Sequence, residues 1–564
     1  MELIVDLGVI FIAAAISGVI LRLFNLPLIV AYILAGIFLG ANFLGIITDK
    51  EIIENLSSLG VALMLFMVGL ELSWSKIKQF SKQAIIIGIG QIIATGLVGY
   101  FLALSFGYQT IIGFYIALIF AFSSTVIVVK LLSDRRDINS LYGKISIGVL
   151  MIQDLVAIVA LIFLYGSQDL NNISATQTLA LNIVKVFMLV ILIYVFKQKL
   201  LPIIFKRMAH STELLLIASI GWAFIMAISS YILGFGLEIG AFLAGVALAS
   251  LPYRLEISAQ TKSLRDFFIT LFFVTLGLNV VFDFSQWNLA QIVIWILFII
   301  VGQTLIVMIL MGALGYRRRT SFQTAITLAQ VSEFSFLIIA IAVSREIITK
   351  TLGSELTIIG IISIIISTIL IEHIDNIYYR LAKFLKIFEK SSGIMAEDKI
   401  KIPAELTDHV IVFGADHIGK QVLESLQKIK HNMLVVDFNP DVIKILSEAG
   451  IPSIYGDMGD PEFINALGLE RASMIISTTH DFHDNLQLVK KISQVNKNSI
   501  IFVMANTPEE AIELYRAGAE RVILPSTLVS DLYKEIIINF KKRKRFNIQK
   551  EIKTLKQLHQ KFFK

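Results

Sequence analysis

The chain of 564 residues contains no cysteine, and only 16% of its residues are charged. Without cysteine it can hold no disulfide framework, no thiolate metal site and no cysteine nucleophile. Its apolar share of 56% exceeds the roughly 45–50% that is typical of soluble domains. The net charge of +6 belongs to loops and a C-terminal tail, and it does not indicate binding to nucleic acid. The N-terminus lacks the basic segment of a signal peptide, so we expect a retained first helix.

Long hydrophobic segments recur from residue 3 to about residue 377. Each has the length of about 18–25 residues that crosses a bilayer, so they predict a polytopic α-helical membrane domain over 1–377. The thirteen predicted spans are 3–21, 27–45, 55–72, 84–105, 110–130, 143–165, 178–196, 212–234, 236–252, 266–282, 289–314, 321–344 and 354–376.

Lysine and arginine are concentrated in alternate loops of this domain. The basic loops lie near residues 22, 76–82, 130–144, 197–207, 254–265 and 317–319. By the positive-inside rule these loops face the cytoplasm. We therefore expect a multi-pass protein of the plasma membrane, in contact with lipid, with its N-terminus outside and everything after residue 377 in the cytoplasm.

Short sequences recur about 208–212 residues apart. The tripeptide LAG occurs at 34–36 and 243–245, GL at 69–70 and 277–278, GQ at 90–91 and 302–303, and AFSS at 121–124 corresponds to AQVS at 329–332. Seven predicted helices separate equivalent spans, and an odd number reverses their orientation. Such inverted repeats are typical of secondary transporters, whose binding sites lie at the midplane where broken helices meet.

The repeat predicts that the fifth and twelfth spans are broken helices that cross. Polar residues lie at mid-depth in both: Ser123, Ser124 and Thr125 in the first, and Gln330, Ser332 and Glu333 in the second. Backbone leaves helical geometry at this depth only where it lines a cavity, and freed carbonyls can bind cations. The alternative is that these residues only hold helices together through hydrogen bonds. Glu333 is either a second titrating group or a charge that neutralises a half-helix end.

A single carboxylate, Asp154, lies near the middle of the predicted span 143–165, directly after Gln153. An ionisable group at that depth is costly and usually marks an ion or proton path. Burial favours its neutral form and a nearby cation favours its ionised form, so a proton and a monovalent cation would compete for this site. Exchange at one carboxylate is one-for-one and electrically neutral. The alternative is a polar pair that packs helices together.

The membrane half resembles the Kef-like branch of the monovalent cation:proton antiporters. The motifs that carry the resemblance are PLIVAYILAGIFLG (27–40), LMLFMVGLELS (63–73), AFSSTVIVVKLL (121–132), GVLMIQDLVAI (148–158), GAFLAGVALASLPYRLEI (240–257), LFFVTLGLNV (271–280) and LAQVSEFSF (328–336). The resemblance implies a homodimer in which a core domain moves against a dimerisation scaffold. It also implies that Asp154 binds the cation and the proton, with Gln153 and residues 123–125 adjacent. The Gln-Asp pair is similar to that of potassium efflux members, whereas Asp-Asp pairs accompany electrogenic sodium exchange.

Beyond a basic connector at 378–406, short β-type segments alternate with helical ones. This alternation predicts a cytoplasmic α/β domain of Rossmann type over 407–530. Its first turn contains a Gly-rich segment that precedes a helix, and Asp437 follows the second strand at the spacing of a ribose-binding acid. The residues of that turn that we expect near a phosphate are Gly414, Asp416, His417, Ile418 and Gly419.

Asp416 stands where the central glycine of a dinucleotide motif would be, and its side chain would crowd and repel a pyrophosphate. The domain resembles the regulator-of-potassium-conductance family, also called TrkA-N, whose members pair and gate transporters on nucleotide binding. The resemblance implies an adenosine site lined by Asp437, Gly456, Asp457 and Thr478. An adenine nucleotide, AMP or NAD(H), is the expected regulator, and a sheet that binds no nucleotide is the alternative.

The sequence thus predicts a transporter that exchanges K⁺ for H⁺, rather than an enzyme. Na⁺/H⁺ exchange on the same fold is the main alternative. A regulated channel is less favoured because no TVGYG-like filter occurs, and a tethered dehydrogenase would need a substrate domain. Only a basic helical tail, 531–564, follows the nucleotide fold. That tail could contact anionic lipid, pack on a partner subunit, or be solvated.

Overall fold

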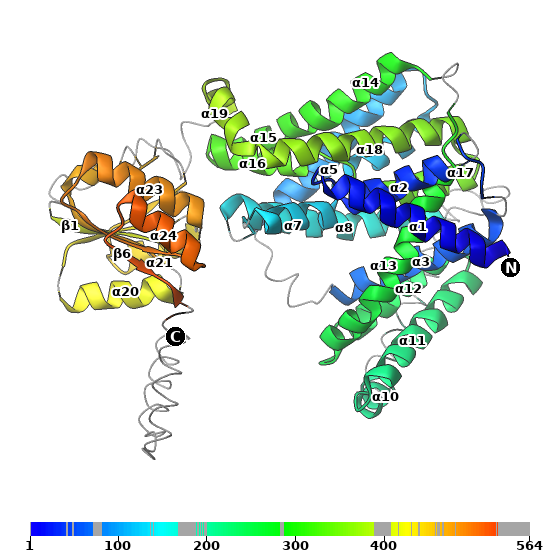
Figure 1. The fold of residues 1–564 in the computed structure, drawn as a ribbon, viewed down its shortest axis with the longest axis horizontal. Coiled ribbons are helices and arrows are strands. Elements are labelled where there is room, and N and C mark those ends of the chain that lie inside the picture. The colour runs from blue at the N-terminus through cyan, green and yellow to red at the C-terminus, as the bar shows by residue number, and fades with distance from the viewer. Residues whose placement is uncertain are drawn as a thin grey trace. The chain divides into compact units, whose positions relative to one another are not determined.

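The structure is a computed structural model with two compact units, residues 1–390 and 391–564 (Figure 1). It describes residues 2–40, 43–47, 50–71, 82–166, 188, 191, 193, 196, 200–282, 287–388, 408–525 and 527, apart from short breaks at 136, 139, 416, 430, 438–439, 457, 460–462, 465–466 and 480.

All the regular elements that the structure describes in the first unit are helices. Its elements are α1 (Glu2–Arg22), α2 (Leu28–Leu39), α3 (Lys50–Glu71), α5 (Lys82–Ser105), α6 (Thr110–Ala121), α7 (Thr125–Asp134), α8 (Leu141–Gly166), α10 (Leu201–Met208), α11 (Thr212–Ile232), α12 (Leu237–Leu248), α13 (Arg254–Leu278), α14 (Leu289–Leu297), a π-helical turn η2 (Phe298–Gly302), α15 (Gln303–Ala313), α16 (Arg318–Leu328), α17 (Glu333–Ser344), α18 (Lys350–Glu372), α19 (Ile374–Leu385) and a 3₁₀ turn η3 (Lys386–Phe388). A helix satisfies its own backbone hydrogen bonds, which hydrocarbon requires.

Each predicted span coincides with a described helix or a broken helix, except for 178–196, most of which lies outside the described residues. Eight of the described spans are long and apolar enough to cross a membrane. Helices α2 and α12 and the apolar part of α3 are shorter, and the first half of α13 is rich in charged and polar residues. The predicted polytopic helical fold is therefore confirmed.

The helices of this unit form two groups. Helices α1, α2, α3, α11, α12 and α13 pack on one another and are called the scaffold group here. Helices α5 to α8 and α14 to α19 form the core group, which contains the broken helices.

Within the scaffold group, repeated glycines lie where helices cross. Gly36 faces Gly277, and Gly69 faces Gly245, so closely that an added Cβ on any of them would collide with backbone atoms. The repeated LAG and GL sequences are therefore the contact points of two equivalent helix pairs, α2 with α13 and α3 with α12. Small residues allow this close approach of helices inside a membrane.

The second unit is a six-stranded, fully parallel sheet in the order β3-β2-β1-β4-β5-β6. Its elements are β1 (His409–Phe413), α20 (His417–Lys428), β2 (Met433–Asp437), α21 (Pro440–Glu448), β3 (Ser453–Tyr455), the 3₁₀ turn η5 (Leu469–Arg471), β4 (Ala472–Ser477), α23 (Phe482–Val495), β5 (Ile500–Met504), α24 (Pro508–Ala517) and β6 (Arg521–Ile523). Hydrophobic clusters on both faces of the sheet form its core. The predicted doubly wound domain is confirmed.

The start of the predicted connector 378–406 is helical. Residues up to 388 continue as α19 and η3, which pack on α16 and α15. The remainder of the connector and the predicted tail 531–564 lie outside the described residues.

Candidate functional site

The two broken helices cross at their breaks. The backbone N–H of Ser332 donates to the carbonyl of Phe122 at 3.0 Å, and the Ser123 hydroxyl donates to the carbonyl of Leu328 at 2.6 Å. The Gln330 amide adds a longer contact of 3.5 Å with the carbonyl of Ser124. These bonds tie the break between α6 and α7 to the break between α16 and α17. The predicted crossed arrangement is therefore present, and it brings together the polar residues Ser124 and Gln330, which are 206 positions apart.

Equivalent unbroken helices support the two breaks in the same way. In the first repeat the N–H of Ser123 donates at 2.9 Å to the side-chain oxygen of Gln153 on α8. In the second the N–H of Val331 donates at 3.3 Å to the hydroxyl of Ser363 on α18. Gln153 and Ser363 stand at corresponding repeat positions. The internal symmetry therefore extends to the hydrogen bonds that hold each break open.

Both the oxygen and the nitrogen of the Gln153 side-chain amide are hydrogen-bonded within the protein. Its oxygen accepts from Ser123, and its nitrogen donates to the side-chain oxygen of Gln91 on α5. Gln91 in turn contacts the Thr95 hydroxyl at 3.3 Å and the carbonyl of Ala121 at 3.5 Å. Because Gln153 is fully buried, this network fixes the end of α6. The geometry supports a positioning role for Gln153 beside Asp154, rather than direct cation binding.

Asp154 lies next to the first break and is partly exposed. The Thr125 hydroxyl, in the first residue of α7, donates to its Oδ2 at 2.9 Å. A carboxylate oxygen and a hydroxyl oxygen are thus adjacent, and both are oxygen ligands of the kind that hard cations prefer. Asp154 neither faces away from the break nor is sealed from it. The arrangement can hold either a proton or a monovalent cation.

Glu333 is buried at the start of α17, directly after the N-cap Ser332. Its carboxyl interacts with the Ser124 hydroxyl and with the backbone N–H groups of Val126 and Glu333 itself. These donors belong to the N-termini of α7 and α17, where each helix carries a partial positive charge. Of the two roles expected for Glu333, this placement favours neutralisation of the half-helix ends.

Two side-chain oxygens at the crossover, Gln330 Oε1 and Glu333 Oε2, have no hydrogen-bond partner among the described residues. Both side chains are buried. An unbonded acceptor at this depth is costly unless water or a cation reaches it. The second break therefore offers acceptor oxygens close to the first.

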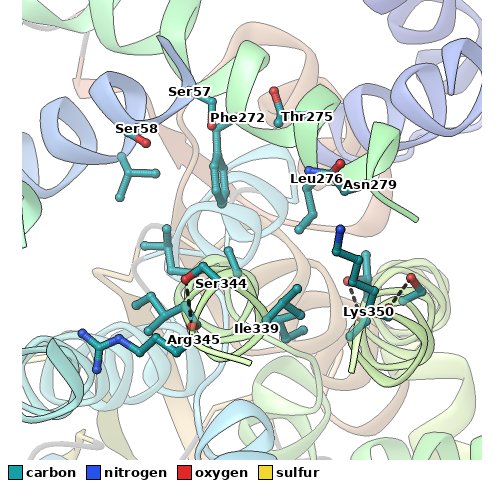
Figure 2. A pocket seen from close by; sticks show the side chains of 18 of the residues that line it. Ser57, Ser58, Phe272, Thr275, Leu276, Asn279, Ile339, Ser344, Arg345 and Lys350 are labelled. Atoms are coloured by element: carbon teal, nitrogen blue, oxygen red, sulfur yellow. Dashed lines mark hydrogen bonds between the residues drawn. The ribbon is translucent and has the colours of Figure 1, made fainter. Parts of the chain in front are cut away.

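A cavity of about 730 Å³ separates the scaffold group from the core group (Figure 2). Ser57, Phe272 and Asn279 lie on one side of it, and Ile339, Arg345 and Lys350 lie on the other. Asp154 does not line this cavity, although α17, which begins at the second break, forms one of its walls. The cavity therefore lies along the boundary where the resemblance places movement between core and scaffold.

The Rossmann-like unit presents its predicted residues at the carboxyl ends of β1, β2 and β4. Gly414 has φ +85°, and a Cβ there would lie 2.7 Å from the Thr478 hydroxyl. The Asp437 carboxylate accepts from the backbone N–H of Ala415 at 2.7 Å. Thr478 donates to the carbonyls of Phe413 and Gly414 at 3.1 and 3.0 Å. Asp437 and the glycine turn are therefore adjacent.

The other predicted residues of this edge are placed less completely. Gly419 approaches Gly414 so closely that a Cβ would lie 2.2 Å from its carbonyl oxygen. Gly456 lies against the ring of Phe463, and Ile418 is exposed at the start of α20. His417 is the first residue of α20. Asp416 and Asp457 lie outside the described residues.

Comparison with known proteins gives two family matches. Residues 9–374, more than half of the chain, match the family described as "Sodium/hydrogen exchanger, transmembrane". The chain belongs to this exchanger family. Residues 410–525 match the TrkA-N domain, so the exchanger carries the predicted second domain.

Similar proteins agree with this assignment. The exchanger is 27% identical to a putative K(+) efflux antiporter KefB of Alkalimonas amylolytica, over 89% of this chain and 76% of that protein. It is also 27% identical to the glutathione-regulated potassium-efflux system protein KefC of Klebsiella pneumoniae, over 90% of this chain and 80% of that protein. The sodium proton antiporter MjNhaP1 of Methanocaldococcus jannaschii shares the fold, with a TM-score of 0.50 and 18% identity, over 69% of this chain and 99% of that chain.

Three residues of the exchanger's site were not among the predicted site residues. Gln91 and Ser363 support the two breaks, and the Gln303 amide donates to the carbonyl of Phe120 at 2.6 Å. The repeated GQ sequence at 90–91 and 302–303 was a usable signal, because a buried amide recurring at equivalent depth implies a shared partner. Ser363 carried no such signal, since its helix contains other serines.

Proposed function

We propose that this protein exchanges K⁺ for H⁺ across the plasma membrane, one for one. The observation that carries the proposal is the contact between Asp154 and Thr125 at the crossing of two broken helices. A carboxylate that is partly exposed there can alternate between a protonated and a cation-bound state. The family match and the relatives named as potassium efflux antiporters support this chemistry.

In this mechanism Asp154 carries both ions in turn. With a proton bound the carboxyl is neutral, and with a cation bound the pair is neutral, so both states are tolerated in a water-poor site. An empty carboxylate is not tolerated equally well. Movement of the core group against the scaffold group would then expose the loaded site to one side of the membrane at a time.

The buried network around Gln153 supports electroneutral exchange. The residue directly before Asp154 is Gln153, a neutral amide that is hydrogen-bonded to Ser123 and Gln91. No second titrating group therefore stands beside Asp154 in the sequence. One carboxylate that exchanges one proton for one monovalent cation moves no net charge.

We further propose that the TrkA-N domain regulates exchange by binding an adenine nucleotide, AMP or NAD(H), and that the protein acts as a homodimer. Support comes from the adjacency of Asp437 to the glycine turn, where a ribose hydroxyl could bond to the carboxylate. An unphosphorylated ribose fits an acidic side chain better than a 2′-phosphate does.

The test is proton flux in vesicles that contain the purified protein and a pH-sensitive dye. A K⁺ pulse should drive proton movement in the wild type, and Asp154→Asn should reduce it to the level of empty vesicles. Asp266→Asn is the matched control, because Asp266 is an exposed carboxylate on α13 that pairs with its neighbour Arg265 at 2.7 Å. Equal flux in the Asp154→Asn variant and the wild type would refute the assignment.

Na⁺/H⁺ exchange is the second candidate, and the family name and the fold shared with MjNhaP1 favour it. Pulses of Na⁺ and Rb⁺ in the same vesicles separate the two. We expect Rb⁺ to replace K⁺ and Na⁺ to be inactive, and the opposite order would assign sodium exchange.

A further inference from the structure

Helix α19 begins directly after the last spanning helix and packs against the first turns of α16 (Figure 1). Ile374, Tyr378 and Leu385 form its buried face. The Tyr378 ring packs against the ring of Phe322 on α16, with centroids 6.0 Å apart. Arg318, at the start of α16, donates to the carbonyl of Ala382 at 3.1 Å. The helix is therefore fixed to the core group at several points.

One carboxylate in the first turn of α19 contacts both broken helices. Asp375 Oδ2 accepts from Arg135 Nη2 at 2.8 Å, and Arg135 caps the C-terminus of α7. Asp375 Oδ1 lies 3.1 Å from the amide nitrogen of Gln323 and 3.4 Å from Arg319 Nη2, both on α16. Asp375 thus joins the ends of α7 and α16 that are farthest from the breaks.

Arg135 and Arg319 both contact the Asp375 carboxylate, one at each oxygen. Arg319 is buried, with 7% of its side chain exposed, and Arg135 exposes 20%. Arg135 is also held by Asp137 at 2.9 Å and by the carbonyl of Glu372 at 3.0 Å. Hydrogen bonds between charged groups are strong and directional, so Asp375 sets the spacing of the two half-helices.

The short helices α7 and α16 connect the contacts of Asp375 to the proposed ion site. The first residue of α7 is Thr125, which binds Asp154, and α7 has 10 residues. The last residue of α16 is Leu328, whose carbonyl accepts from Ser123, and α16 has 11 residues. A shift at the outer end of either helix is therefore transmitted to the crossover.

We propose that Asp375 is a positioning residue for ion exchange, which acts on the site through α7 and α16. The proposal rests on the function proposed above. It assigns a transport role to a carboxylate that lies outside the crossover.

The first test is the K⁺ dependence of proton flux in vesicles. Asp375→Asn should raise the apparent KM for K⁺ about fivefold, with a smaller change in maximal rate, because the site geometry and not the titrating group is altered. Asp375→Glu should restore most of the affinity. Asp266→Asn, which removes a carboxylate from a pair within one helix, should behave as the wild type. A KM for Asp375→Asn equal to that of Asp266→Asn would overturn the proposal.

The second test measures no transport. It adds a second variant, so that the proposal stays testable if Asp375→Asn folds poorly. Gln323→Leu removes only the 3.1 Å bond to Asp375. In the intact protein, both Gln323→Leu and Asp375→Asn should speed hydrogen exchange in peptides that span the breaks at 122–127 and 329–333. Unchanged exchange in both peptides would overturn the proposal. If wild-type vesicles show no K⁺ response, the proposed function fails, and hydrogen exchange alone decides the role of Asp375.

Discussion

At the scale of single residues, the proposed ion site depends on the Thr125 hydroxyl, which donates a hydrogen bond to the Asp154 carboxylate. Thr125 is the first residue of α7, so its position follows directly from the break that precedes it. The N-cap Ser124, which accepts from the N–H of Ile127 at 3.3 Å, starts this helix. A local capping interaction therefore places the hydroxyl that binds Asp154.

Thr125→Val should raise the apparent KM for K⁺ about tenfold, because a hydrogen bond to a charged group contributes about 1.5–3 kcal/mol and tenfold corresponds to about 1.4 kcal/mol. Valine keeps the shape and removes the hydroxyl. Thr125→Ser keeps the hydroxyl and is the control, with an expected KM close to that of the wild type. Measurement of proton flux against K⁺ concentration tests this, and equal KM values for the two variants would contradict it.

His409, at the amino end of β1, is a buried residue with a predicted effect on stability. Its side chain is 1% exposed, and neither ring nitrogen has a hydrogen-bond partner among the described residues. Burial lowers the pKa of His409, the positive charge of Arg471 lowers it further, and Asp408 opposes this. The folded state therefore disfavours the protonated ring.

The sign of the pH dependence follows from that direction. Above the unfolded pKa of about 6.5 the ring is neutral in both states, and this group has no effect. As pH falls below that value the unfolded chain binds a proton that the folded chain does not, so the TrkA-N domain loses up to about 1.4 kcal/mol per pH unit until the folded pKa is reached.

Hydrogen exchange of β1 and β4 in the intact protein, corrected for intrinsic rates, measures this effect. We expect protection to fall between pH 7.5 and pH 5.5 in the wild type, because the unfolding free energy falls by up to about 1.4 kcal/mol per pH unit below the unfolded pKa. In His409→Leu the fall should be smaller. An equal fall in the two proteins would assign the effect to other groups.

At the scale of elements, the scaffold group depends on helices that cross at glycine. On Gly245 of α12, a Cβ would lie 2.0 Å from the carbonyl oxygen of Phe66 on α3. Neither backbone can yield without moving its helix, because the colliding atom is a main-chain oxygen.

Gly245→Ala should therefore destabilise the membrane domain by about 1–3 kcal/mol, the range for overpacked interiors. Gly221→Ala on α11 is the matched control, because nothing lies within 4 Å of a Cβ at that position. Thermal unfolding in detergent compares them: Gly245→Ala should melt at a lower temperature than Gly221→Ala. Equal melting temperatures would show that α3 and α12 can separate without cost.

The sequence predicted the elements better than it predicted the contacts between them. The length of the hydrophobic segments predicted the spans, and the repeats predicted both broken helices. The repeats also contained the glycines at which helices cross, although the sequence alone did not show that role. The partners of Gln153 could not be predicted, since Gln91 lies 62 residues away and amides have many possible partners. Asp375 and Arg135 are 240 residues apart, and only packing brings them together.

The predicted connector shows the same limit. Its basic and polar composition indicated a connector between two domains, and its first part forms α19 and η3. A helix of 12 residues is marginal alone in water, so α19 depends on its buried contacts with α16. Tertiary packing, which composition does not reveal, decided this segment.

At the scale of the whole molecule, an exchanger domain and a Rossmann-like domain share one chain. If the second domain binds an adenine nucleotide at the Asp437 edge, AMP or NADH should raise the melting temperature of the protein through preferential binding to the folded state. Asp437→Ala should lose that response. Glu448→Ala, which removes an exposed carboxylate from α21, should keep it. A wild type that responds to neither nucleotide would favour a sheet without a ligand.

The central claim is that one proton is exchanged for one K⁺ at Asp154, and the balance point of the two gradients tests it most directly. In vesicles with a fixed tenfold K⁺ gradient, proton flux should stop at an opposing pH difference of about one unit, because the two gradients then hold equal free energy. That balance point should not move when the membrane voltage is clamped at a different value, and no flux should occur in Asp154→Asn. A balance point that shifts with voltage, or flux that persists in Asp154→Asn, would contradict the account.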